Sequence, residues 1–198
     1  MKTLARQLFL AFMVLVSFSS FAASESAYQV VSQAGDKLFS RIKAEQAQIK
    51  TDDELLETIV EQELMPYIDY QYAAYKILGK HLRKTSKAQR KEFVSAMRHY
   101  LVRTYAGALK QYKQQKVTFH PPVKTSGKIV AVTAVISDAN RPDINIDFKM
   151  RLNKKKQVWK AFDMVVEGIS LLSTKQAEIA KKIREQGIDK TTAQLAAA

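Results

Sequence analysis

The sequence of 198 residues contains no cysteine, and this absence excludes several kinds of chemistry. Without thiols the chain cannot form disulfide bonds, use a cysteine nucleophile or bind a metal through cysteine. Because disulfide bonds are excluded, the fold must be held by its hydrophobic core rather than by covalent links. Glycine and proline are also sparse, with six and four residues.

Long apolar runs are scarce, and the one clear example lies at the N-terminus. Lys2 and Arg6 precede the apolar stretch 8–18, and Ser20 and Ala22 follow it. This order is typical of a cleavable signal peptide, and the run is shorter than the about 20 residues that a bilayer span needs. We expect residues 1–22 to be removed, with cleavage after Ala22 or, as second choice, after Ala23. The mature chain 23–198 would then work outside the cytoplasm as a single domain, with two small lobes as the alternative.

Acidic residues are outnumbered by basic ones, 19 to 32, which gives a formal net charge of +13. In the cytoplasm such a balance would suggest nucleic acid as a partner. Export argues against nucleic acid as the partner and favours anionic lipid surfaces or acidic protein patches instead. Plain solubility is the alternative explanation of the charge.

Apolar residues recur at spacings of three and four in several segments, which predicts amphipathic helices. The predicted helices cover residues 27–47, 55–64, 67–80, 87–115 and 171–186. Thr51 to Glu54 and Ser86 to Gln89 have the pattern of capping boxes, and Gly187 that of a C-cap. Pro66 is expected to end or restart a helix. The Ala-rich tail from Thr191 is expected to fray.

The apolar period changes to two after residue 115, which predicts strands. The predicted strands cover residues 117–119, 128–137, 144–152 and 158–166. Residues 128–137 are apolar on both faces, so we expect that strand to be covered on both sides. Helices segregated against four consecutive strands with short turns predict an α+β fold with an antiparallel sheet.

No catalytic or metal-binding constellation stands out among the polar residues. His81, His99 and His120 do not pair with one another or with an acid at helical spacing, and His81 and His99 are expected on solvated faces. Asp147 and Asp163 lie on adjacent predicted strands, and a pocket acid there could act as a base. A small isomerase-like enzyme is therefore one alternative, and an adaptor with a solid core is another.

The segment from Val158 to Gln176 carries a resemblance to a known family. It resembles the pattern W-x-x-[YF]-D-[MV]-x-x-E-G-[VI]-S of the MlaC family, periplasmic phospholipid-binding proteins of the toluene-tolerance auxiliary type. Segments 58–67, 78–106 and 186–195 agree with other parts of the same family. Thr174-Lys175-Gln176 is more similar to the enterobacterial branch than to the pseudomonad branch.

This resemblance implies a carrier whose curved sheet is wrapped by helices around an apolar cavity, with a cystatin-like outline or that of nuclear transport factor 2. Members hold phospholipid tails and exchange lipid between an outer-membrane MlaA–porin complex and the MlaD ring of the inner-membrane MlaFEDB ABC transporter. They maintain the lipid asymmetry of the outer membrane. The resemblance implies neither enzymatic activity nor a cofactor, and we expect a monomer whose cargo is phospholipid.

Large flexible apolar side chains are the expected lipid contacts, because Met and aromatic residues line adaptable apolar sites. For each of these residues, the alternative is that it packs in the hydrophobic core and does not contact lipid. We place the tails between the long helix and the apolar sheet face, and expect Met150→Glu to abolish lipid co-purification while leaving the fold intact. The predicted contacts are Val94, Met97, Leu101, Tyr105, Val132, Ile146, Phe148, Met150, Met164, Ile169 and Leu172.

Overall fold

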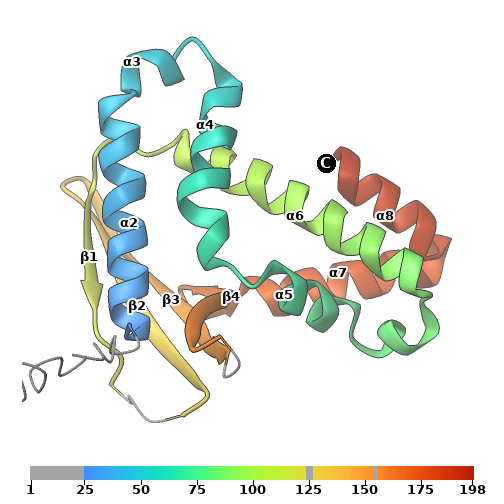
Figure 1. Ribbon diagram of the computed structural model, residues 1–198. Coiled ribbons are helices and arrows are strands. Elements are labelled where there is room, and N and C mark those ends of the chain that lie inside the picture. Colours follow the sequence, from blue (N-terminus) through green and yellow to red (C-terminus); the bar gives the residue numbers. More distant parts are fainter. Residues whose placement is uncertain (1–24, 124–126, 154–155) are drawn as a thin grey trace, which may run out of the picture.

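The computed structural model describes residues 25–123, 127–153 and 156–198, so the predicted signal peptide lies outside the described residues. Within those ranges, no helix combines the length and the apolar character needed to cross a bilayer. The sheet and one helix that lies along it form one part of the molecule, and most of the other helices form a second part beside it (Figure 1). The α+β class predicted from the sequence is confirmed.

The sheet is curved, antiparallel and five-stranded, in the order β1-β2-β3-β4-β5. Its strands are β1 (Lys116–His120), β2 (Ile129–Asp138), β3 (Arg141–Asn153), β4 (Val158–Val166) and β5 (Ile169–Ser170). The sequence predicts four of them. It misses β5 because a strand of two residues has no period to detect, and β5 is defined only by its pairing with Val165 and Val166.

One helix covers one face of this sheet, beside β1 and β2 (Figure 1). This helix, α2 (Ala27–Ala44), places Ala27, Val30 and Val31 against Val130, Val132 and Met150 of β2 and β3. The far face of β2 is left open, since Ile129 is 53% exposed and Ala131 is exposed too. The expectation that residues 128–137 are covered on both sides is therefore wrong.

The chain then crosses from the sheet to the helical part through short, irregular helices. These elements are α3 (Gln46–Ile49), α4 (Asp53–Ile59), a π-helical turn η1 (Val60–Leu64) and a 3-10 turn η2 (Met65–Tyr67). The prediction that Pro66 ends or restarts a helix is confirmed, because η1 ends at Leu64 and Pro66 lies in the separate turn η2. The capping box predicted at Thr51 is wrong. Asp52 caps α4 by accepting hydrogen bonds from the backbone N–H groups of Glu54 and Leu55.

Four longer helices and one 3-10 segment build the helical part. They are α5 (Tyr70–Leu78), η3 (Gly79–Lys84), α6 (Lys87–Leu109), α7 (Leu171–Gln186) and α8 (Ile188–Ala197). The capping box at Ser86 and the Gly187 cap are confirmed. The long helix ends at Leu109, earlier than predicted.

The expectation of a frayed tail is wrong. Residues from Ile188 form α8, whose Thr191, Thr192 and Leu195 are buried, and Leu195 packs in one cluster with Phe93 and Met97 of α6. The burial of these three side chains holds α8 against the rest of the helical part, although the segment is rich in alanine.

Candidate functional site

The pairing register brings the large apolar side chains of the sheet onto one face. Val132 of β2 lies opposite Phe148 of β3, and Phe148 lies opposite Met164 of β4. Directly paired residues project to the same side of a sheet. We call the set Val130, Val132, Ile146, Phe148, Met150, Met164 and Val166 the apolar face.

Exposure rises along this face in steps of two residues of β3. Met150 is fully buried beneath α2, Phe148 and Ile146 are half-buried, and Ile144 is 42% exposed. The same apolar surface thus begins in the core and ends in solvent.

The exposed end of the apolar face continues onto β5. Val166 is paired with Ile146 on one side and with Ile169 on the other. Ile169 is 62% exposed, and Leu171, which follows at the start of α7, is 42% exposed. We call Ile144, Ile146, Val166 and Ile169 the open apolar edge. Exposed apolar residues that adjoin one another indicate a binding surface more often than single ones do.

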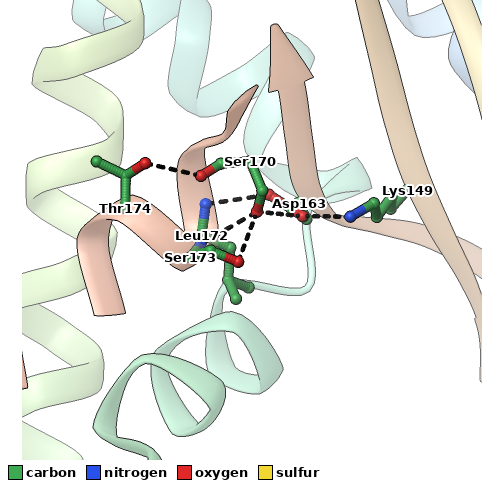
Figure 2. Close-up of polar contacts among 6 residues, drawn as sticks. All are labelled: Lys149, Asp163, Ser170, Leu172, Ser173 and Thr174. Atoms are coloured by element: carbon green, nitrogen blue, oxygen red, sulfur yellow. Dashed lines mark hydrogen bonds and ion pairs between the residues drawn. The ribbon is translucent and has the colours of Figure 1, made fainter. Parts of the chain in front are cut away.

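A buried carboxylate fixes the element that carries Ile169. Asp163 of β4 is buried, and its carboxylate accepts hydrogen bonds from Ser170 Oγ at 2.8 Å and the backbone N–H of Leu172 at 3.0 Å (Figure 2). Lys149 Nζ forms an ion pair with it at 3.1 Å. The carboxylate therefore ties β4 to β5 and to the first turn of α7. Asp163 therefore has a structural role. We call its carboxylate and the three donors, from Lys149, Ser170 and Leu172, the latch.

A tight turn between β4 and β5 completes this arrangement. Glu167 and Gly168 both have positive φ, at 47° and 81°. The Glu167 carboxylate accepts hydrogen bonds from the backbone N–H of Asn145 at 2.5 Å and from Asn145 Nδ2 at 3.3 Å. These contacts offset the strain that a left-handed conformation costs a residue other than glycine. The E-G-x-S part of the sequence pattern therefore builds the turn that positions Ile169.

Asp147, the other acid considered from the sequence, lies on the same side of the sheet as Asp163, opposite the apolar face. Asp147 is half-buried, and its carboxylate accepts a hydrogen bond from Thr133 Oγ1 at 2.6 Å. No group of three or more His, Cys, Asp or Glu side chains among the described residues could hold a metal ion. His81 is half-buried rather than solvated, and burial, followed by the charges of Lys80, Lys84 and Arg184, lowers its pKa.

The residues predicted on the long helix do not all face the sheet. Met97 is 1% exposed and lies in a helical cluster with Phe93 of α6 and Ile179 of α7. Val94 and Leu172 border the same cluster. Leu101 borders both this cluster and a second one that α2, α4 and α6 share. Met97 and Val94 are thereby placed in the helical part, apart from the apolar face.

Tyr105 of the long helix lies at the edge of a helical cluster, the one that α2, α4 and α6 share. Burial raises the pKa of Tyr105 to about 12, and the negative charge of Asp163 on β4 adds to this effect. Tyr105 is half-buried, and it is not part of the apolar face.

The prediction from the sequence did not include two groups of residues that belong to this face. Ala27, Val30 and Val31 of α2 cover the inner half of the apolar face, whereas the prediction gave that role to the long helix. Ile144 and Val166 belong to the open apolar edge and were not chosen as contacts. Their signal was present, because both continue the alternation of the predicted strands.

Two surface cavities, of about 280 and 330 Å³, lie among the helices. The first is lined by residues of α2, α3, α4 and α6 and of the turn after α6, and the second by residues of α5 and α6. Of the predicted contacts, only Val94 lines either cavity. The apolar face is therefore defined by its graded exposure and not by these cavities.

Comparison with known proteins gives consistent similarities. The family profile described as MlaC protein matches residues 32–197. The intermembrane phospholipid transport system binding protein MlaC of Haemophilus influenzae is 36% identical over 169 residues, which cover 84% of this chain and 79% of that protein. The toluene tolerance protein ttg2D of Pseudomonas putida is 23% identical over 172 residues, covering 85% of this chain and 79% of that protein.

A solved structure supports the fold. The phospholipid-binding protein of Ralstonia solanacearum, determined in complex with a phospholipid, superposes with a TM-score of 0.75 at 23% sequence identity. The superposition covers 86% of this chain and 99% of that one.

Proposed function

This chain belongs to the MlaC family, and from that membership we propose that it is a water-soluble carrier that binds phospholipid by its acyl tails in the periplasm. It collects or delivers lipid at an MlaA–porin complex in the outer membrane and at the MlaD ring of the MlaFEDB ABC transporter in the inner membrane. This exchange maintains the lipid asymmetry of the outer membrane.

A physical argument supports the need for a carrier. Exposing each methylene of an acyl chain to water costs about 0.8 kcal/mol, so two chains of about 15 methylenes cost roughly 24 kcal/mol. Free lipid therefore does not cross an aqueous gap at a useful rate. A carrier must cover most of both tails and release them only when it is docked.

The observation that carries the proposal is the graded exposure of the apolar face. Met150 at its inner end is fully buried, whereas Ile144 and Ile169 at its outer end are 42% and 62% exposed. Acyl tails that lie along Phe148 and Met164 would remove the outer part of this surface from water. The lipid headgroup would then stay in solvent beyond the open apolar edge.

No covalent step is needed for this function. The protein acts as a monomer without cofactor or metal, and the phospholipid is its cargo. The latch formed by Asp163 keeps β5 and α7 in place beside the open apolar edge. Any energy from ATP enters through a partner and not through this chain.

Native mass spectrometry of the purified protein tests the proposal, with Ile146→Glu as the main variant. Ile146 is half-buried at the open apolar edge, so a carboxylate there desolvates poorly against an acyl tail. We expect the wild-type protein to carry phospholipid and Ile146→Glu to carry none. Met150→Glu is a poor test, because Met150 is 0% exposed and a buried charge there would damage the fold itself.

A matched control is available on the opposite face of the same sheet. Ala131 is exposed and pairs with Lys149, so Ala131→Glu adds the same charge without touching the apolar face. We expect Ala131→Glu to keep its lipid. Normal lipid content in a folded Ile146→Glu variant would rule out this placement, and wild-type protein that never takes up lipid would rule out the function.

A further inference from the structure

The second of the two surface cavities lies between α5 and α6, in the helical part of the molecule (Figure 1). It has a volume of about 330 Å³ and shares no residue with the apolar face of the sheet. The residues that line it are Gln71 and Tyr75 of α5 and Lys87, Arg90, Lys91 and Val94 of α6. Half of these residues are cations, and we call the site the α5–α6 cavity.

The three cations of the α5–α6 cavity come from the first two turns of α6. Lys87 and Lys91 are exposed and four residues apart, so they lie on the same side of the helix. Gln89 lies about half a turn away from both, and there it donates a hydrogen bond to Asp189 of α8 at 2.9 Å. The Asp189 carboxylate is therefore held on the side of α6 that faces away from the cavity.

Arg90 is fixed at the cavity by neutral partners. Its Nε donates a hydrogen bond to Thr85 Oγ1 at 3.1 Å, and its Nη2 donates one to the Thr85 carbonyl oxygen at 2.7 Å. Thr85 is buried, so these contacts hold the guanidinium group in place without neutralising its charge. They use two of the five N–H donors of the guanidinium group, which leaves three for a ligand.

The hydroxyl group of Tyr75 adds an uncharged donor from α5. It accepts a hydrogen bond from Gln71 Nε2 at 3.2 Å, and its own proton has no acceptor among the described residues. A hydroxyl that accepts from Gln71 can still donate that proton to a ligand. Both sides of the cavity therefore offer hydrogen-bond donors.

No carboxylate lines the cavity, whose lining residues all belong to the described part of the chain. Asp69 at the start of α5 forms an ion pair with Arg151 of β3, and Glu61 of η1 forms one with Arg98 of α6. Glu92 is exposed on α6 and does not line the cavity. The three cations of the cavity form no ion pair with any described residue. The cavity therefore has an excess of positive charge that an anion would neutralise.

The lining and the size of the cavity indicate which kind of anion fits. Phosphate oxygens are strong acceptors, and Arg and Lys are the side chains that most often bind them. A cavity of about 150 Å³ holds one benzene molecule, so about 330 Å³ holds a phosphate group with a small polar substituent. Val94 is the one aliphatic residue of the lining, so an acyl tail or the apolar anchor of a protein segment would find little surface to cover.

We propose that the α5–α6 cavity binds a phosphate ester. Its oxygens accept hydrogen bonds from the Arg90 guanidinium group and the Tyr75 hydroxyl, and Lys87 and Lys91 approach it from the solvent side. The phosphate belongs either to a lipid headgroup in a membrane surface or to a soluble ester, since the two sources present the same chemistry. The site lies apart from the proposed lipid site, so the two can be tested independently.

The test titrates sn-glycerol 3-phosphate into nitrogen-15-labelled mature protein at constant ionic strength and follows the amide chemical shifts. We expect saturable shifts centred on residues 71–75 and 87–94. The double variant Lys87→Glu/Lys91→Glu should weaken binding by about tenfold or more, because two attractions become repulsions. Tyr75→Phe keeps the ring and the net charge, and the loss of one hydrogen bond should weaken binding by about threefold to tenfold.

Sedimentation with phosphatidylcholine vesicles that contain phosphatidylglycerol identifies the source of the phosphate. If both Lys87→Glu/Lys91→Glu and Tyr75→Phe reduce vesicle binding, the site takes a lipid headgroup. If both variants reduce the binding of glycerol phosphate but leave vesicle binding unchanged, the site takes a soluble ester.

Lys37 of α2 and Lys190 of α8 are exposed, and Lys37→Glu/Lys190→Glu is the matched control for net charge. Equal weakening by the two double variants, or shifts spread over the whole basic surface, would overturn the proposal, because either result means non-specific charge attraction. A peptide of alternating Glu and Leu that shifts these amides when glycerol phosphate does not would overturn it in favour of a protein partner. Native mass spectrometry of Lys87→Glu/Lys91→Glu should find normal phospholipid content, which separates failure at this cavity from failure of the proposed lipid site.

Discussion

Asp163 has the strongest claim to a structural role among the polar residues of the sheet. Lys149 is 40% exposed, so its ion pair contributes less than about 1 kcal/mol. Most of the stabilisation comes from the hydrogen bonds that Ser170 Oγ and the Leu172 N–H donate to the charged carboxylate. We expect Asp163→Ala to lower the free energy of unfolding by about 2–3 kcal/mol in urea denaturation.

Asp147 provides the comparison for this prediction. It accepts one side-chain hydrogen bond, from Thr133, on the face of the sheet that α2 does not cover. Asp147→Ala should therefore cost only about 1 kcal/mol. Equal losses in the two variants would mean that the contacts between β4, β5 and α7 do not depend on the Asp163 carboxylate.

The raised pKa of Tyr105 predicts a loss of folding stability at alkaline pH. Its pKa is raised to about 12 in the folded protein, whereas the unfolded chain has the ordinary value of about 10. Above pH 10 the unfolded state loses the phenolic proton while the folded state keeps it, so unfolding becomes more favourable as pH rises. This contribution is absent below pH 10 and grows to roughly 2 kcal/mol of lost stability near pH 12.

The phenylalanine variant isolates this effect from the titration of lysines. Tyr105→Phe keeps the ring and removes the ionisable group. We expect its stability in urea to fall less steeply than that of the wild type between pH 10 and pH 11.5, with parallel behaviour from pH 7 to pH 9. Parallel curves over the whole range would contradict a raised pKa.

Individual elements could be predicted from the sequence where their apolar period is long and uninterrupted. The alternation from Ile144 to Leu152 locates β3, and Ser86 with Gln89 locates the start of α6. The π-turn Val60–Leu64 and the strand Ile169–Ser170 could not be predicted. One inserts an extra residue into a helical period, and the other is too short to have a period.

The terminal helix α8 shows how composition can mislead. Its alanines suggested fraying, yet Leu195 is 5% exposed and packs in the cluster of Phe93 and Met97. We expect Leu195→Ala to lower the free energy of unfolding by about 2–4 kcal/mol, because a buried leucine leaves a cavity. Lys190→Ala on the exposed side of α8 should change it by less than about 0.5 kcal/mol. Thermal or urea denaturation of both variants measures the difference, and equal stabilities would mean that α8 is detached in solution.

At the scale of the whole molecule, periodicity identified apolar faces but did not identify which faces meet. Phe148, Met150 and Met164 were placed on one face, and the register of β3 and β4 agrees with this. We predicted that the long helix packs against this face, but α2 covers it at Met150. The local pattern shows that both helices are amphipathic, but it does not show which of them packs on the sheet, because that depends on long-range packing.

The incomplete cover of the apolar face leads to a prediction about lipid removal. A ligand that binds only the folded state at a concentration about 100 times its dissociation constant adds about 2.7 kcal/mol to stability. For a chain of this size, that corresponds to a rise in melting temperature of roughly 5–10 °C. We therefore expect delipidated protein to melt roughly 5–10 °C below lipid-loaded protein in differential scanning calorimetry.

The Ile146→Glu variant decides whether that shift arises at the apolar face. With a carboxylate at the open apolar edge, added phospholipid should leave the melting temperature unchanged, whereas Ala131→Glu should respond as the wild type does. If the loaded and delipidated wild-type proteins melt together while mass spectrometry detects bound lipid, the lipid is not bound preferentially by the folded state. The exposed isoleucines at positions 144 and 169 would then need another explanation, such as contact with a protein partner.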